Sequence, residues 1–262
     1  MKNRIITGIV MAIGFLGLLR WGGIPFALLI MAMALIGLYE FIRMHGYRVY
    51  DAAGWIGSAA MIGLTFPWYA LDGVRVPPME SLTWVFIFLL FSVTVLSANR
   101  INVRQVSIIT IGVLYIGIGF RCMTFFRLEY GILWSFFLFV CTWISDIGAY
   151  FVGMAFGRRP LWPAISPKKT VEGSLGGIAC TVLFAVLYSF LFPDFMHWPQ
   201  AALLGLIISL LGQWGDLIQS AYKRVNQVKD SGTIFPGHGG VLDRCDSWLI
   251  VFPAVHLILS WI

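Results

Sequence analysis

Charged residues are scarce in this 262-residue chain: only 11% of its positions are Asp, Glu, Lys or Arg, whereas 59% are hydrophobic. Soluble domains carry about a quarter charged residues, so this composition excludes an ordinary soluble protein and indicates an integral membrane protein. The apolar runs also lack the alternating polar pattern of membrane β-strands. We therefore expect an all-α polytopic membrane protein.

Several motifs of soluble enzymes are missing. The four cysteines are far apart and form no C-x-x-C pair, which leaves a structural zinc site or a disulfide framework unsupported. The chain has no Walker loop, no dinucleotide-binding fingerprint and no G-x-S-x-G elbow. It also lacks a basic stripe with base-stacking aromatics, so the net charge of +6 predicts no nucleic-acid partner. Loops beside anionic lipid account for that charge.

What the chain does have is a series of apolar segments of nearly bilayer-spanning length. They lie near 5–19, 21–39, 52–71, 82–98, 105–120, 131–155, 175–192, 201–219 and 247–262. Gly22-Gly23 separates the first two segments. With a cytoplasmic N-terminus, 14 of the 18 Lys and Arg residues fall on the inner side, as the positive-inside rule requires. About nine transmembrane helices are expected.

The chain is expected to form a single membrane domain, 1–262, in the inner membrane of a bacterium. Its polar constellations all lie after residue 140. We therefore expect helices of residues 1–130 to serve mainly as scaffold. Residues 131–262 are expected to form the catalytic part, with a polar site facing the cytoplasm.

Asp146 falls near the middle of the apolar segment 131–155. On a helix it shares one small or polar face with Thr142, Ser145, Ala149, Tyr150 and Gly153. A carboxylate at this depth is costly unless it faces protein, water or a cation. A functional site and a structural hydrogen bond with Tyr150 are both open interpretations.

The loop RRPLWPAISPKKTVEGSLGG, 158–177, contains three prolines that prevent a continuous helix. Ser166 or Thr170 can cap the helix that follows, and a helix N-terminus beside Lys168 and Lys169 favours a phosphate. The alternative is that the four positive charges only hold the loop on the inner side.

The segment 216–246 concentrates eight of the 30 charged side chains, four of each sign. Asp243 and Asp246 are one turn apart on a helix and can reach one ion or two adjacent ions. Hard carboxylate oxygens suit Mg²⁺. The PGHGG turn, 236–240, allows backbone N–H groups to approach an anion closely. A salt-bridged loop is the alternative interpretation.

The run from Ser220 to Asp246, S-A-Y-K-R-x4-K-D-S-G-T-I-F-P-G-H-G-G-V-L-D-R-C-D, resembles the signature of the phosphatidate cytidylyltransferase (CDP-diacylglycerol synthase) family. The resemblance extends to the Asp146 segment and to SPKKTVEGSLGG. It is weaker at the N-terminal RIITG and at the Glu40-Phe41 pair. Two residues differ from the family's usual aliphatic ones: Tyr222 and Cys245.

The resemblance implies that CTP and phosphatidic acid give CDP-diacylglycerol and pyrophosphate in phospholipid biosynthesis, with Mg²⁺ in two cation sites. The residues then expected to be catalytic are Asp216, Lys223, Asp243 and Asp246, and the three aspartates are the expected metal ligands. The expected substrate-binding residues are Asp146, Lys168, Lys169, Glu172, Ser220, Arg224, Lys229, His238, Gly239, Gly240 and Arg244. Membrane lipid is a further partner, and a homodimer is typical of the family.

Three other functions fit the sequence less well. The CDP-alcohol phosphotransferases have a D-G-x2-A-R-x8-G-x3-D-x3-D pattern, which this chain lacks. A lipid kinase of the dolichol kinase type shares the use of CTP but not the long signature. A transporter with Asp146 in its pathway predicts paired broken helices in two related halves, whereas the halves here differ.

Overall fold

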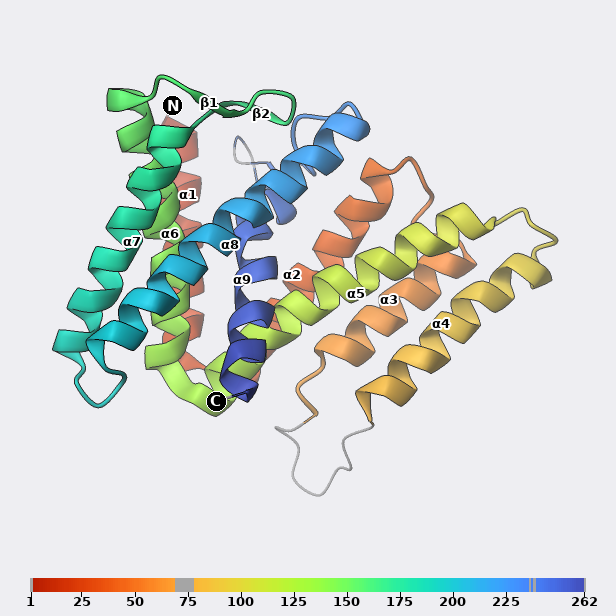
Figure 1. Cartoon of the computed structure of the whole chain (residues 1–262). Helices are drawn as coiled ribbons and strands as arrows, with labels where there is room; N and C mark the ends of the chain where they lie inside the picture. Colours follow the sequence, from red (N-terminus) through yellow and green to blue (C-terminus); the bar gives the residue numbers. More distant parts are fainter. Residues whose placement is uncertain (1, 69–77, 236, 238, 262) are drawn as a thin grey trace. The chain divides into compact units, whose positions relative to one another are not determined.

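The structure is a computed structural model, and it describes residues 2–68, 78–235, 237 and 239–261 (Figure 1). The chain forms two compact units. Unit 1 comprises Met1–Glu129 and Val228–Arg244, and unit 2 comprises Tyr130–Gln227 and Cys245–Ile262. Val228–Arg244 therefore packs with the N-terminal helices, although it lies in the half that the sequence predicts to be catalytic.

Unit 1 is built on helices that follow one another along the chain (Figure 1). They are α1 (Lys2–Trp21), α2 (Gly23–Met44), α3 (Ala52–Thr65), α4 (Met79–Leu96) and α5 (Val103–Phe125). α5 packs against α2 and α3, and α3 packs against α4. The predicted break is present, because Gly22 has a φ of 74° between α1 and α2. Asp51 and Asn102 cap α3 and α5 through their side-chain oxygens.

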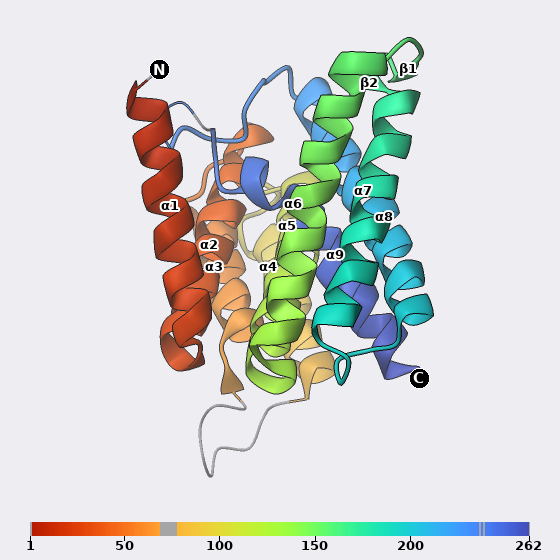
Figure 2. The same ribbon diagram turned by 90° about the vertical axis from the view of Figure 1, so that its left-hand side faces the viewer.

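A π-helical turn, Phe126–Tyr130, leads from α5 into unit 2. The elements of unit 2 are α6 (Gly131–Phe156), β1 (Pro160–Trp162), β2 (Ser166–Thr170), α7 (Val171–Leu191), α8 (Trp198–Val225) and α9 (Leu242–Ser260), whose first turn belongs to unit 1. α7 packs against both α6 and α8 (Figure 2). The two strands form an antiparallel hairpin that the sequence did not predict.

Glycines allow α6 and α7 to approach closely. A Cβ atom added at Gly177 would lie 2.6 Å from the Ser145 carbonyl oxygen, and one at Gly173 would lie 2.7 Å from that of Ala149. Small residues at such contacts are typical of helix packing in membranes. Ser145 and Ala149 belong to the face of small and polar residues predicted around Asp146. α7 therefore packs on that face through Gly177 and Gly173.

Hydrogen bonds between helices add to this packing in unit 2. The hydroxyl groups of Ser145 on α6 and Ser209 on α8 are 2.7 Å apart. The Trp248 indole on α9 donates to the Thr142 hydroxyl oxygen at 3.0 Å. In a membrane, apolar side chains gain little by leaving lipid for another helix, so hydrogen bonds of this kind help to hold the helices together.

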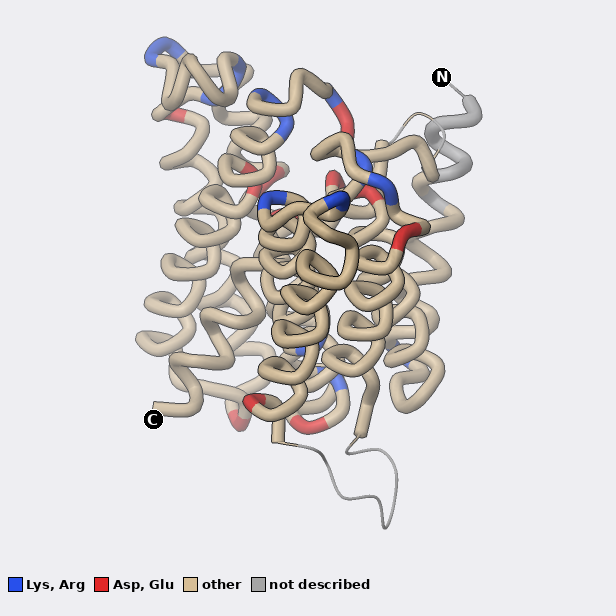
Figure 3. The backbone as a smooth tube through the Cα atoms, turned by 90° about the vertical axis from the view of Figure 1, so that its right-hand side faces the viewer, with Lys and Arg blue, Asp and Glu red and all other residues tan. Residues whose placement is uncertain are grey.

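Within the described residues, five helical stretches are long and apolar enough to cross a membrane. They are Gly23–Met44, Met79–Leu96, Val103–Phe156, Val171–Leu191 and Trp198–Val225. Figure 3 shows charged residues mainly at helix ends and in connections. The predicted all-α membrane protein is confirmed apart from the short hairpin, whereas nine spans remain a prediction.

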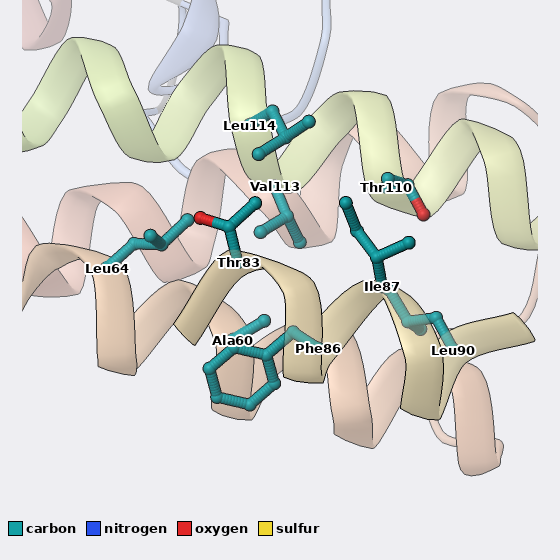
Figure 4. A pocket seen from close by; sticks show the side chains of 9 residues that line it. All are labelled: Ala60, Leu64, Thr83, Phe86, Ile87, Leu90, Thr110, Val113 and Leu114. Carbon is teal, nitrogen blue, oxygen red and sulfur yellow. The ribbon is translucent and has the colours of Figure 1, made fainter. Parts of the chain in front are cut away.

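A small cavity lies among α3, α4 and α5, with side chains such as Phe86, Leu90 and Val113 around it (Figure 4). Its volume is about 10 Å³. That is close to the minimum for a single water molecule. This cavity is therefore a packing defect and not a substrate site.

Candidate active site

A cavity of about 400 Å³ opens in unit 2 among α6, β2, α7 and α8. Asp146 of α6, Lys168 and Lys169 of β2, and Asp216 of α8 line it, together with Gln213. Small-molecule sites usually measure about 300–1,000 Å³. The cavity is therefore large enough for a polar substrate group, and charges of both signs face it.

Asp216 is at the centre of the electrostatics of this cavity. Its Oδ2 forms an ion pair with the Lys169 ammonium group, and its Oδ1 accepts a hydrogen bond from the Ser220 hydroxyl at 3.3 Å. The negative charge of Asp216 also acts on Asp146 and on Asp246 of α9. Three of the predicted acidic residues therefore come together within one unit.

Two basic side chains oppose the repulsion among these carboxylates. Lys169 attracts Asp146 as well as Asp216, and Lys223 of α8 attracts Asp246. Asp246 additionally accepts a hydrogen bond from the Ser247 backbone N–H at 2.8 Å. An arrangement of several carboxylates beside lysines can bind cations and phosphates in the same place.

The β1–β2 hairpin places the two cavity lysines. At its base, Glu172 accepts hydrogen bonds from the backbone N–H groups of Arg158 and Arg159 at 3.0 and 3.2 Å. Thr170 then caps α7 by accepting from the Gly173 N–H at 3.1 Å, as one of the two predicted alternatives. Arg224 on α8 donates to the Ile165 carbonyl oxygen at 3.0 Å. Glu172 and Arg224 thus contact the hairpin backbone on two sides.

The other predicted site residues lie in the Val228–Arg244 segment of unit 1: Lys229, Gly239, Gly240, Asp243 and Arg244. Asp243 Oδ2 accepts from the Ser231 N–H at 2.7 Å, the Ser231 hydroxyl at 3.0 Å and the Gly240 N–H at 3.0 Å. Asp243 therefore anchors the glycine turn. His238 lies outside the described residues.

A second cavity, of about 650 Å³, adjoins this turn in unit 1. Lys229, Asp230 and Ser231, which precede the glycine turn, line it together with Glu40 and Arg43 of α2. The Arg43 guanidinium donates to the Tyr39 hydroxyl at 3.0 Å. Acidic, basic and hydroxyl groups thus line the polar part of this cavity.

Glu40 on α2 is a polar residue whose contacts sequence reasoning missed. Its side chain is only 3% exposed. It accepts hydrogen bonds from the Ser231 hydroxyl at 2.9 Å and from the backbone N–H groups of Val241 and Leu242 at 2.9 and 3.0 Å. The available signal was a lone acid at the end of a long apolar run, beside the weak family resemblance of the Glu40-Phe41 pair.

No group of three His, Cys, Asp or Glu side chains in the described part of the chain is close enough to enclose a metal ion. The predicted ligands Asp216 and Asp246 lie in unit 2, and Asp243 lies in unit 1. A metal ion would therefore need oxygen atoms from a substrate or from water in addition to those of the protein.

The sequence profile described as the cytidylyltransferase family matches residues 2–262. A protein of Bacillus subtilis (strain 168) named phosphatidate cytidylyltransferase is 40% identical, and the alignment covers 99% of this chain and 98% of the relative. Proteins of the same name from Staphylococcus aureus (strain COL) and Staphylococcus epidermidis (strain ATCC 12228) are 40% and 38% identical, with 99% of each chain covered. The chain belongs to the cytidylyltransferase family.

Proposed function

We propose that this protein is a phosphatidate cytidylyltransferase, which makes CDP-diacylglycerol and pyrophosphate from CTP and phosphatidic acid for phospholipid biosynthesis. The observation that carries the proposal is the unit 2 cavity, where Asp146, Asp216, Lys168 and Lys169 face one space. The names of the relatives support the choice of substrates. A polar cavity without these relatives would support phosphate chemistry only.

The reaction exchanges one phosphoanhydride bond for another. An oxygen of the phosphatidate phosphate forms a bond to the α-phosphorus of CTP, and the bond from that phosphorus to the bridging oxygen breaks. The electron pair leaves with pyrophosphate. A phosphate monoester is already largely ionised at neutral pH, so the nucleophile needs no strong general base.

Catalysis then depends on aligning two polyanions and on neutralising charge on the leaving group. In our proposal, Lys168 and Lys169 bind substrate phosphates at the cavity. Lys223 is catalytic, and its positive charge attracts Asp246. Glu172 and Arg224 support substrate binding by holding the lysine hairpin. Lys229, His238, Gly239 and Arg244 keep their predicted roles in binding phosphate, whereas the Gly240 N–H is already donated to Asp243.

Mg²⁺ is the proposed cofactor, because the acidic residues offer hard oxygen ligands. Mg²⁺ is usually held by one or two carboxylates together with substrate phosphates, so no cage made by protein alone is required. Asp216 and Asp246 of unit 2 would hold one ion, and Asp243 of unit 1 is the proposed ligand of a second cation. When bound, such an ion neutralises charge on the CTP phosphates.

The membrane arrangement is part of the proposal. Nine helices cross the inner membrane of a bacterium, with the N-terminus and the active site on the cytoplasmic side. The 14 to 4 distribution of basic residues supports this orientation. We also propose a homodimer, as the family resemblance implies.

The test uses purified protein in detergent with phosphatidic acid, Mg²⁺ and CTP labelled in the cytosine ring. Label should enter the lipid phase, and an equal amount of pyrophosphate should be released. Release of CDP with no cytosine label in the lipid would instead support a lipid kinase.

Asp246→Asn tests the acidic cluster in the same assay. It should lower kcat at least about 100-fold, because loss of an ion contact costs several kcal/mol of transition-state stabilisation. Asp194→Asn is the matched control, since Asp194 is exposed in the connection between α7 and α8. An Asp246→Asn variant with more than about a third of wild-type turnover contradicts the assignment.

A further inference from the structure

Glu40 occupies the position that an anionic ligand would take in the glycine turn. A glycine-rich turn with converging backbone N–H groups is a common binding site for anions. Here the Val241 and Leu242 N–H groups converge on the two carboxylate oxygens of Glu40, a residue 201 and 202 positions away in the sequence. Leu242 is the first residue of α9, so Glu40 satisfies N–H groups at the start of that helix.

Gly232 and Gly240 lie directly against this carboxylate. A Cβ atom added at Gly232 would lie 2.5 Å from Glu40 Oε1, and one at Gly240 would overlap both oxygens of Glu40. Real Cβ atoms do not approach other atoms so closely. The backbone of the turn therefore passes against the Glu40 side chain on two sides.

Ser231 links Glu40 to a predicted active-site residue. The Ser231 hydroxyl lies 2.9 Å from Glu40 Oε2 and 3.0 Å from Asp243 Oδ2. One hydroxyl proton is therefore shared between two carboxylates, and the Ser231 N–H is bound to Asp243 as well. A displacement of Glu40 removes support from Ser231 and from the first turn of α9 at the same time.

We infer that Glu40 is a positioning residue for the reaction: its buried carboxylate fixes the 231–242 turn and thereby the Asp243 side chain. The inference rests on the proposed function, in which Asp243 takes part. It gives α2, which the sequence assigns to the scaffold, a direct role in supporting the site.

The experiment compares Glu40→Gln, Ser231→Ala and the control Glu80→Gln, in which an exposed acid in the first turn of α4 is changed. A carboxamide has one accepting oxygen, and its NH₂ group would face another N–H donor. Two quantities are measured on full-length protein in detergent: backbone hydrogen exchange of peptides covering 231–245, and kcat with the KM for CTP.

In Glu40→Gln, exchange of the 231–245 peptides should be at least about tenfold faster, since a hydrogen bond to a charged acceptor is lost. The kcat should fall by at least about tenfold while the KM for CTP stays within about threefold, because the acid acts on positioning and not on CTP itself. Glu80→Gln should match the wild type in both. Unchanged exchange, or a kcat within about threefold of wild type, overturns the inference.

Ser231→Ala decides the matter if Glu40→Gln does not fold. It removes only the shared hydroxyl, so exchange should rise and kcat should fall by about threefold or more. No change in either quantity overturns the inference. The exchange measurement needs no substrate, so its result remains valid even if the wild-type protein makes no CDP-diacylglycerol, a result that contradicts the proposed function itself.

Discussion

Lys169 is the basic residue that is most directly engaged at the unit 2 cavity, because its ammonium group pairs with Asp216. The two side chains are only 25% and 31% exposed. A substrate phosphate that enters with a bound metal ion can pair with the Lys169 ammonium group, while the metal ion pairs with Asp216. Lys169 thus balances the charge of Asp216, and in the proposed function it also binds a phosphate of the substrate.

Lys169→Ala should raise the KM for CTP at least about tenfold, because hydrogen bonds to charged groups contribute about 1.5–3 kcal/mol. The free energy of unfolding should change by less than about 1 kcal/mol, since partly exposed ion pairs contribute little to stability. Initial rates at varied CTP and thermal unfolding in detergent measure the two effects.

The control for Lys169 is Arg100→Ala, which removes an exposed basic residue from the connection between α4 and α5. It should leave the KM for CTP unchanged. A Lys169→Ala variant with a wild-type KM would remove this residue from the substrate site.

At the scale of elements, the contact between α6 and α7 decides where the hairpin lysines lie, because the hairpin connects these two helices. Gly177→Ala places a methyl group against the Ser145 carbonyl oxygen, 2.6 Å from the added Cβ. The helices must separate, and overpacking of this kind costs about 1–3 kcal/mol. Thermal unfolding in detergent should show the loss.

Gly17→Ala is the matched control on α1, since nothing lies within 4 Å of its added Cβ. It should be neutral or stabilising by up to about 1 kcal/mol, because alanine is the better helix former. Equal unfolding temperatures for the two variants would contradict the close packing of α6 on α7.

Local patterns in the sequence predicted part of this architecture. The Gly22-Gly23 break, the end of α6 before the prolines and the Thr170 cap each depend on residues close together in the chain. The hairpin did not follow from such patterns, because strands of three and five residues rich in proline have no alternating signal. The contact of Glu40 with Leu242 was also missed, since it spans 202 positions.

The same limit applies to the site. The spacing of Asp243 and Asp246 predicts one helical turn between them, and α9 contains both. Spacing cannot show that Asp243 accepts hydrogen bonds from Ser231 and Gly240. These bonds come from backbone N–H groups, which every residue type except proline carries. Nor could spacing show which of the predicted basic residues pairs with Asp216.

At the scale of the whole molecule, the proposed topology places the ends of α7 on opposite sides of the membrane. Its 21 residues give a helix of roughly 31 Å, at 1.5 Å per residue, which matches a hydrocarbon core of about 30 Å. Arg158→Cys should therefore react with a membrane-impermeant maleimide in inside-out vesicles. Asp194→Cys should react only in right-side-out vesicles.

The natural cysteines give this labelling a low background, because Cys122, Cys141 and Cys245 are buried and Cys180 is partly buried. The unsubstituted protein serves as the control. Labelling of both introduced cysteines from the same side would contradict the orientation and the crossing of α7.

The bonds of Glu40 also set an order of events during synthesis. The ribosome adds about 5–20 residues per second, so the Val241 N–H is made roughly 10–40 s after Glu40. Through that interval α2 carries an acid whose partners do not yet exist. Only a chain translated past residue 242 can form the full set of hydrogen bonds to Glu40.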